Sequence, residues 1–449
     1  MDFVTERNMA LLTDLYELTM AQSYFREARN EVSTFDLFVR SLPPRRGFLV
    51  SAGLDTVLTY LERLRFSGEA TEYLGTLGQF DRGFLEYLRG FAFTGTVRAI
   101  PEGEVVFPPE VLLEVTAPRI EAQIIETFLL NQINFQTMIA SKAARVVLAA
   151  RGRPVVDFSP RRDHGTDAAM KVARCAYLAG CAGTSNVLAG MVYGVPVYGT
   201  MAHSYVMSFD DELEAFRAYA RHFPQNCVLL VDTYDTVQGA RNAAAVAEEM
   251  RARNQRLRGV RLDSGDLVDL SRRVRRVLDQ AGFPDVQILA SGDLNEDKIK
   301  ELLEAGAPID AFGVGTELGV SYDAPALGGV YKLVEDSQGY RIKRSTGKVT
   351  LPGRKQVWRV VQHGEMVKDV ITLHDEPGPE SAQALLVEVL AGGKRFVHEP
   401  LEIARLRCRD RLSRLPAAVR ELDGGAYPVK LSARLDSVLN RMASDLAGS

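Results

Sequence analysis

The segment Gly-Thr-Met-Ala-His, residues 199–203, combines residue types that can carry out chemistry. It lies between an apolar run at 195–198 and a segment with a helical pattern. Glycine leaves backbone N–H groups accessible, Thr200 supplies a hydroxyl, and His203 supplies a side chain that exchanges protons near neutral pH. The combination indicates a phosphate-binding or acid–base site. One such segment is weak evidence, because a lone histidine is more often structural than catalytic.

Polar residues follow five other apolar runs of the same region. Repetition strengthens the interpretation, because several independent turns would all have to be rich in such groups by chance. The residues are Asp157, Ser159, Arg161, Arg162, Asp163 and His164 at the first run, Asp232, Thr233 and Asp235 at the third, Arg261, Asp263, Ser264, Gly265 and Asp266 at the fourth, Ser291, Gly292 and Asp293 at the fifth, and Gly315 and Thr316 at the sixth.

The runs that precede these residues have the pattern of parallel strands. Each is short and apolar on both faces, as strands covered on both sides are, and a helical segment separates it from the next. The series predicts βα units that form a closed or nearly closed α/β barrel, with an open doubly wound sheet as the alternative. In both architectures ligands bind at the carboxyl ends of the strands, so the polar residues should converge. The runs lie at 155–158, 195–198, 228–231, 260–262, 286–290, 309–314 and 330–334.

The composition of these strand ends favours a phosphorylated sugar with more than one anionic group. Ser-Gly-Asp at 291–293 and Gly-x-Gly-Thr at 313–316 offer backbone N–H groups and helix N-termini for phosphate. Paired arginines at 161 and 162 suit a second anion. Asp232, Asp263 and Asp293 are candidates to hold Mg²⁺ or sugar hydroxyls. The alternatives are that each aspartate only caps the next helix and that the arginines lie on a solvated turn.

The two ends of the chain differ from this middle part. We expect helices at 9–25, 55–64 and 120–150, strands at 34–39 and 47–51, and a small antiparallel element at 95–116. The last part is predicted to be β-rich at 340–359 and helical at 432–442. The resulting division is an N-terminal α/β domain at 1–150, a barrel at 151–340 and a C-terminal segment at 341–449 that packs back on the N-terminal domain.

Composition excludes several classes of protein. The 449 residues carry a net charge of −4 without a basic stripe, which disfavours nucleic acid as a partner. Every apolar run falls short of the roughly 18 residues typical of a membrane span, and the first residues do not form a signal peptide, so we expect a cytoplasmic protein.

The four cysteines are scattered without a Cys-x-x-Cys pair, which favours buried reduced thiols over metal ligands or disulfides. Walker and Rossmann glycine motifs are absent.

Over most of its length the sequence resembles the nicotinate phosphoribosyltransferases. The resemblance is carried by long motifs in a fixed order: LLTDLYELTMAQ, FSPRRDHGTDAAMKVAR, GTSNVLAG, GTMAHSY, RLDSGDL, ASGDLNEDKI, GVGTELGVSYDAPALGGVYKLV and LPGRKQVWR. It implies the type II phosphoribosyltransferase fold, in which an irregular α/β barrel is combined with a second α/β domain built from both ends of the chain. It also implies a homodimer, in which the tyrosine helix near the N-terminus reaches the neighbouring subunit's site.

The reaction implied by the resemblance joins nicotinate to the phosphoribosyl group of 5-phosphoribosyl 1-diphosphate. The products would be nicotinate mononucleotide and diphosphate, with ATP hydrolysis coupled, Mg²⁺ as cofactor and a ligase-type classification. His203 resembles the histidine that ATP phosphorylates, and Met201 stands where nicotinamide-using relatives have an aspartate, which favours the acid as substrate. By the same resemblance Tyr16, Thr200 and Arg261 would bind nicotinate, and Arg161, Asp263, Ser291, Gly292, Gly315 and Thr316 would bind the phosphoribosyl donor.

Two rival functions remain open at this point. A quinolinate or nicotinamide phosphoribosyltransferase would share the fold and most of the site. A non-catalytic barrel that binds a phosphorylated sugar for regulation is a rival of another class. The density of arginine, aspartate and histidine at the strand ends favours an enzyme over the regulatory protein.

Overall fold

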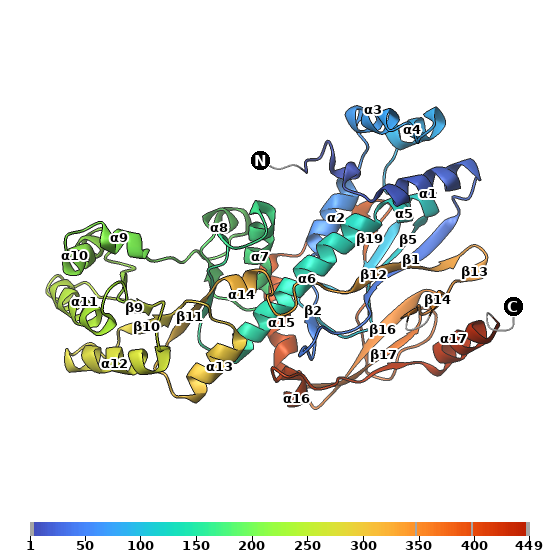
Figure 1. The fold of residues 1–449 in the computed structure, drawn as a ribbon. Helices are drawn as coiled ribbons and strands as arrows, with labels where there is room; N and C mark the ends of the chain where they lie inside the picture. Colours follow the sequence, from blue (N-terminus) through green and yellow to red (C-terminus); the bar gives the residue numbers. More distant parts are fainter. Residues whose placement is uncertain (1–3, 346–347, 397, 446–449) are drawn as a thin grey trace. The chain divides into compact units, whose positions relative to one another are not determined.

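The computed structural model describes residues 4–345, 348–396 and 398–445, and Figure 1 shows its fold. The chain forms two compact units, one from Met1–Ser141 with Ala326–Ser449 and one from Lys142–Pro325. The first unit therefore combines both ends of the sequence. The limits fall at 141 and 325, whereas the sequence analysis expected 150 and 340.

The second unit is built on six parallel strands. Five coincide with expected apolar runs, and their side chains are largely buried, as strands covered on both faces require. Their order in the sheet is β7-β6-β11-β10-β9-β8. The strands are β6 (Val155–Asp157), β7 (Gly183–Thr184), β8 (Val228–Leu230), β9 (Gly259–Leu262), β10 (Gln287–Ala290) and β11 (Ala311–Val314).

The sheet is open in the structure, with β7 and β8 at its edges. The last strand, β11, pairs in parallel with the first, β6, as barrel closure requires. Among the described residues no ladder joins β7 to β8, which are the two edges of the sheet. The expected α/β class with a parallel sheet is confirmed, whereas closure of the barrel is not confirmed.

Two of the expected strands are corrected. At 195–198 only Val197 forms a single parallel bridge, to Thr184 of β7. Pro196 has no N–H to donate, and Val197 and Tyr198 after it are exposed, so this run does not form a regular strand. The run at 330–334 is part of β12 (Gly329–Asp336), which pairs antiparallel with β1 (Val32–Val39) in the first unit.

The helices of the second unit begin at the polar turns. Asp235, Asp266 and Asn295 accept backbone N–H groups at the starts of α11, α12 and α13, so the capping alternative is correct for Asp235 and Asp266. Helix α11 lies between α10 and α12 (Figure 1). The helices are α7 (Thr166–Leu178), α8 (Val187–Tyr193), α9 (His203–Met207), α10 (Glu212–His222), α11 (Thr236–Arg251), α12 (Leu267–Gln280), α13 (Glu296–Glu304) and α14 (Thr316–Gly319).

The first unit contains a seven-stranded sheet in which strands from both ends of the sequence are interleaved. Its order is β13-β12-β1-β5-β3-β19-β20, and a four-stranded sheet has the order β18-β16-β17-β21. Besides β1 and β12 the strands are β2 (Leu49–Val50), β3 (Thr96–Ala99), β4 (Val105–Val106), β5 (Val111–Pro118), β13 (Gly339–Tyr340), β14 (Arg344–Ser345), β15 (Lys348–Val349), β16 (Lys355–Gln362), β17 (Glu365–Leu373), β18 (Gln383–Ala384), β19 (Val387–Ala391), β20 (Lys394–Arg395) and β21 (Val429–Leu431).

The helices of the first unit include two that the sequence predicted as longer. The helix expected at 9–25 is interrupted before Asp14, whose extended backbone starts α1, and the helix expected at 120–150 is divided at Ile125. No helix of the described residues is long and apolar enough to cross a membrane. The helices are η1 (Met9–Leu11), α1 (Leu15–Arg26), α2 (Leu54–Arg63), α3 (Gly68–Thr76), α4 (Arg82–Arg89), α5 (Arg119–Ile124), α6 (Glu126–Ala149), α15 (Leu401–Ser413), α16 (Ala417–Arg420) and α17 (Ala433–Asp445).

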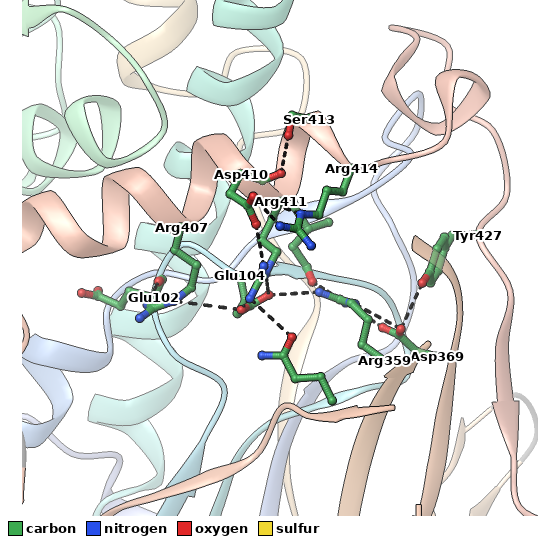
Figure 2. A network of polar contacts seen from close by, with 12 residues as sticks. Glu102, Glu104, Arg359, Asp369, Arg407, Asp410, Arg411, Ser413, Arg414 and Tyr427 are labelled. Atoms are coloured by element: carbon green, nitrogen blue, oxygen red, sulfur yellow. Dashed lines mark hydrogen bonds and ion pairs between the residues drawn. The ribbon is translucent and has the colours of Figure 1, made fainter. Parts of the chain in front are cut away.

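A buried network of ion pairs joins the early and late segments of this unit (Figure 2). Arg359 of β16 lies 2.6 Å from Asp369 of β17 and 3.1 Å from Glu104, which precedes β4. Arg411 of α15 donates to the same Glu104 carboxylate at 2.9 Å. Arg359 belongs to the LPGRKQVWR motif, and its contacts give that part of the motif a structural role.

Candidate active site

Arg261 connects three of the strand-end turns of the second unit. From β9 its guanidinium donates to Ser291 Oγ at 2.7 Å, to Thr200 Oγ1 at 3.1 Å and to Asp263 Oδ1 at 2.6 Å. It also donates to the backbone oxygen of Met201 at 3.3 Å. These partners lie far apart in the sequence, so the fold brings predicted site residues together around one cation.

His203 belongs to the same cluster. As the first residue of α9 it places Nδ1 3.1 Å from Thr233 Oγ1 and Nε2 3.8 Å from Asp263 Oδ2. The imidazole is partly exposed. It is therefore accessible to a phosphoryl donor and is held by a hydroxyl on one side and a carboxylate on the other.

Asp232 and Asp263 form the acidic part of the cluster. Asp232 Oδ2 accepts the backbone N–H of Asp263 at 2.9 Å and the Ser264 hydroxyl at 2.7 Å. Asp232 is 9% exposed, and its other oxygen is buried without a hydrogen-bond partner among the described residues. Burial opposes ionisation of Asp263, but hydrogen bonds from Ser291 and Arg261 outweigh it and lower the pKa of that carboxyl. These contacts therefore favour the ionised form of Asp263.

Gly292 allows the turn after β10 to approach this cluster closely. Its φ is +90°, a region that glycine adopts without steric strain, and a Cβ there would collide with the backbone oxygen of Asp263. Ser291 next to it is buried and donates to Asp263 Oδ1 at 2.5 Å. Glycine at 292 is therefore required by backbone geometry, and Ser291 is placed by its hydrogen bonds to Arg261 and Asp263.

A second group of predicted residues lies at the ends of β6 and β11. The N–H of Phe158, just after β6, donates to Val314 O at 2.8 Å, and Gly315 and Thr316 start α14 directly after β11. Arg161 lies in the turn that follows Phe158, is exposed, and forms no ion pair with another described residue. The Arg261 guanidinium lies over the Phe158 ring, 5.5 Å from its centre. The two groups are therefore neighbours along one edge of the sheet.

Two predicted site residues are not joined to these groups. Asp293 is exposed, and among the described residues no group of three or more His, Cys, Asp or Glu side chains is placed to hold a metal ion. Binding of Mg²⁺ by Asp232, Asp263 or Asp293 therefore stays a prediction. Tyr16 lies in the first turn of α1 in the other unit and is 47% exposed, with its hydroxyl bonded to Glu126. Its contact with nicotinate stays a prediction.

The sequence analysis assigned no role to two residues that support the site. Thr184 of β7 donates to the buried Asp157, and the Phe158 ring lies under Arg261. Thr184 falls within the motif GTSNVLAG, which was the available signal. Phe158 begins the motif FSPRRDHGTDAAMKVAR, which was the corresponding signal.

Comparison with known families decides where the chain belongs. The model of the nicotinate phosphoribosyltransferase (NAPRTase) N-terminal domain matches residues 11–134, and that of the nicotinate phosphoribosyltransferase (NAPRTase) family matches residues 154–333. The chain belongs to the nicotinate phosphoribosyltransferase family. Within this family, nicotinate phosphoribosyltransferase pncB2 of Mycobacterium tuberculosis is 51% identical over 437 residues, which cover 96% of this chain and 94% of that protein. The Bacillus subtilis nicotinate phosphoribosyltransferase is 45% identical over 381 residues, which cover 82% and 77%.

Solved structures agree with membership of the nicotinate phosphoribosyltransferase family. The crystal structure of human nicotinic acid phosphoribosyltransferase has a TM-score of 0.86 at 30% identity and covers 96% of this chain and 99% of that one. The structure of nicotinate-nucleotide pyrophosphorylase from Pyrococcus furiosus has a TM-score of 0.77 at 26% identity, with coverage of 92% and 98%. The residues described above therefore lie on a fold that this family uses.

Proposed function

We propose that this protein transfers the phosphoribosyl group of 5-phosphoribosyl 1-diphosphate to nicotinate, giving nicotinate mononucleotide and diphosphate in the salvage of NAD precursors. The observation that carries the proposal is the contact of Arg261 with Thr200, Asp263 and Ser291. One cation at the centre of three turns can receive the carboxylate of nicotinate while its neighbours receive the phosphoribosyl donor. The names of the relatives in Mycobacterium tuberculosis and Bacillus subtilis support the same substrate.

Recognition of nicotinate follows from the chemistry of Arg261 and Thr200. A guanidinium binds a planar carboxylate through two parallel hydrogen bonds, and the Thr200 hydroxyl supplies a further donor. Met201 adds no acceptor for an amide, because its side chain is buried and apolar. Tyr16 is proposed to stack on the pyridine ring, which would leave the ring nitrogen free to react.

The donor is proposed to bind at the turns after β6, β10 and β11. Backbone N–H groups at Gly292, Gly315 and Thr316 suit phosphate oxygens, Arg161 adds a positive charge, and Asp263 can accept ribose hydroxyls. The pyridine nitrogen forms the new bond to C1 of the ribose as the bond to diphosphate breaks. That nitrogen carries no proton in the reacting form, so no general base is required, and the main task of the site is alignment and charge stabilisation.

Magnesium is the proposed cofactor, and the protein offers two neighbouring carboxylates for it. The buried, unpartnered oxygen of Asp232 and the neighbouring Asp263 could hold the ion together with donor phosphates, which is how Mg²⁺ commonly binds. When bound, the ion would neutralise charge on the departing diphosphate. Asp293 is exposed and is a weaker candidate.

ATP is the proposed co-substrate, and it would transfer its γ-phosphoryl group to His203. A neutral imidazole nitrogen would attack the γ-phosphorus, the bond to ADP would break, and water would later release phosphate and restore the imidazole. The phosphohistidine would reshape the site toward tighter binding of the phosphoribosyl donor, and this coupling to ATP hydrolysis is what makes the proposed enzyme ligase-type. His203 is partly exposed and lies beside Asp263 and Thr233, which supports this role.

The assembly and compartment are also proposals. We expect a homodimer in which Tyr16 of one chain serves the site of the other, and we expect the enzyme to work in the cytoplasm. All four cysteines are buried free thiols, and burial raises the pKa of Cys227 and of Cys408 to about 12, which is consistent with a reducing compartment.

A steady-state assay with three pyridines tests the proposed function. Nicotinate, nicotinamide and quinolinate are each supplied with the phosphoribosyl donor, with and without ATP, and mononucleotide is measured. We expect turnover with nicotinate that ATP stimulates. Preferential turnover of quinolinate or nicotinamide would replace the proposed function, and binding of the donor without turnover of any pyridine would support the regulatory alternative.

A further inference from the structure

The turn after β6 contains two carboxyl groups on either side of one hydroxyl. Asp157, at the end of β6, is fully buried, and Ser159 Oγ lies 2.6 Å from its Oδ1. On the other side, Ser159 Oγ lies 3.1 Å from Asp163 Oδ2. The proposed reaction uses neither carboxyl directly, so their arrangement requires another explanation.

Counting hydrogens assigns one proton to this group. Asp157 accepts the Ser159 N–H at 2.9 Å, the Ser159 hydroxyl and the Thr184 hydroxyl at 2.7 Å, so all its partners donate and it is the acceptor. A serine hydroxyl has only one hydrogen, and the shorter contact to Asp157 takes it. The contact between Ser159 and Asp163 is then attractive only if Asp163 carries a proton and donates it to Ser159 Oγ.

The same turn connects two parts of the proposed donor site. Backbone N–H groups of Arg162 and Asp163 donate to Ser159 O at 2.6 and 3.2 Å, which closes the turn that presents Arg161. On its inner side the turn packs against Gly319 of α14, where a Cβ would collide with Asp163 Oδ1 and Ser159 Cβ. Because α14 begins at Thr316, a shift of Asp163 would change the distance between Arg161 and the turn after β11.

We propose that protonated Asp163 is a positioning residue, which donates to Ser159 and so holds the Arg161 turn against α14 in the geometry that binds the phosphoribosyl donor. The proposal rests on the proposed function for the identity of that anion. Asp163 Oδ1 is buried without a hydrogen-bond partner among the described residues, which also favours the uncharged form of this carboxyl.

Burial raises the pKa of Asp157 as well, against the three hydrogen bonds that it accepts, so the hydrogen-bond count is what places the proton on Asp163. Burial and the negative charge of Asp157 raise the pKa of Asp163 to about 6, against the smaller opposing effects of Ser159 and His164. The raised pKa means that the Asp163–Ser159 bond is fully present at low pH and is lost as the pH rises through about 6. An anion bound beside Asp163 favours the protonated form, so binding of the donor should take up a proton.

The test compares donor KM across pH in the full-length protein and four variants. Asp163→Asn preserves a donor to Ser159 that cannot ionise, whereas Asp163→Ala and Ser159→Ala remove the contact. Asp310→Ala is the matched control, because Asp310 accepts the Ile288 N–H at 2.8 Å at the opposite, amino ends of the strands. The titration of the donor's own phosphate is common to all variants, so differences between them report on Asp163.

We expect Asp163→Ala and Ser159→Ala to raise the donor KM about fivefold to tenfold at low pH, as loss of one hydrogen bond predicts, with the nicotinate KM unchanged. Asp310→Ala should leave both KM values unchanged. The wild-type donor KM should rise several-fold between about pH 6 and about pH 8 relative to Asp163→Asn, whose KM should follow only the donor's titration. The proposal is overturned if Asp163→Asn raises the donor KM as much as Asp163→Ala, or if both substrates are affected equally.

A second measurement separates this proposal from the proposed function. Carbon-detected NMR of the wild type and of Asp163→Asn identifies the Asp163 carboxyl without any activity. A carboxyl that titrates near pH 6 in the wild type and is missing in the variant supports the proton assignment. Titration at the ordinary aspartate value of about 4 overturns it, even in a protein that turns over nicotinate.

Discussion

Arg261 is the residue that we propose discriminates nicotinate from other pyridines. Removing its guanidinium in Arg261→Ala takes away the charged hydrogen bonds to the nicotinate carboxylate, each of which contributes about 1.5 to 3 kcal/mol. We therefore predict that the KM for nicotinate rises about 10-fold to 100-fold, far more than the KM for the phosphoribosyl donor. Steady-state kinetics with each substrate varied in turn measures both values.

Arg258→Ala is the control for this substitution. Arg258 lies on the same segment but is exposed, and its side chain donates to the backbone oxygen of Gln225 at 3.1 Å, away from the site residues. It should leave both KM values unchanged. Equal increases for the two substrates in Arg261→Ala would mean that the residue organises the whole site and does not select nicotinate.

Met201→Asp tests the same substrate preference by adding a group that should favour nicotinamide. Met201 is buried, and its backbone oxygen already accepts from Arg261. A carboxylate at this position can accept the amide N–H groups of nicotinamide and repels the carboxylate of nicotinate. We predict that the ratio of kcat/KM for nicotinamide to that for nicotinate rises several-fold, at reduced overall activity. An unchanged ratio would exclude position 201 from substrate selection.

At the residue scale, the sequence predicted which residues lie near the site. It did not show which of the aspartates there only cap a helix. Asp232 and Asp235 both follow the same strand, but Asp235 caps α11 while Asp232 is buried beside Asp263. The difference depends on side-chain direction after the strand, which a local pattern does not contain. The proton proposed for Asp163 likewise depends on distances within the turn after β6, which only the folded chain shows.

Gly292 shows how a single backbone position controls an element. Gly292→Ala would place a Cβ in a left-handed conformation and against the backbone oxygen of Asp263, so the turn after β10 must move. We predict a thermal midpoint lower by roughly 5 °C and a raised donor KM. Differential scanning fluorimetry and steady-state kinetics measure the two effects.

Gly282→Ala is the matched control at the element scale. Gly282 has a similar φ of +82°, yet its Cβ would meet only the Arg251 side chain, at 4.0 Å. It should lower the thermal midpoint slightly through backbone strain and leave the donor KM unchanged. If both glycine variants changed the donor KM equally, strain and not the contact with Asp263 would be responsible.

Element types were largely predictable, but partners were not. The apolar runs predicted β6 and β8 to β11 correctly, because a parallel strand that is buried on both faces is visible in the sequence as a short apolar run. The run at 195–198 failed because Pro196 removes a ladder donor, and the run at 330–334 was assigned to the wrong sheet. Periodicity indicates that a segment is a strand, while the sheet that it joins is decided by long-range packing.

At the scale of the whole molecule, the proposed dimer makes a specific prediction. If Tyr16 of one chain serves the site of the other, Tyr16→Ala and His203→Asn homodimers each lack ATP-coupled turnover. Heterodimers formed by mixing and refolding or co-expression should recover it, because one of their two sites contains both residues. Activity of co-purified heterodimers measures this complementation.

Two outcomes would oppose that arrangement. Complementation would be absent if Tyr16 served the site of its own chain, since each site would then carry one defect. Sedimentation at the mass of a single 49.5 kDa chain in the active protein would exclude the dimer altogether.

The division of the chain into two units was only partly readable from the sequence. The incomplete patterns at both ends indicated that they belong together, and β19 does pair with β3 in one sheet. The limit at 141 falls inside the long helix α6, where the sequence has no break to mark it. Ion pairs such as Arg359 with Glu104 join segments far apart in the chain and leave no local signal.

The most direct measurement is the amount of nicotinate mononucleotide formed per ATP consumed in the wild type and in His203→Asn, with His222→Asn as a control on the exposed end of α10. We predict that ATP consumption and product formation are coupled in the wild type and in His222→Asn. His203→Asn should form mononucleotide slowly without consuming ATP. Retention of the wild-type coupling ratio in His203→Asn would contradict the assignment of the phosphorylated residue.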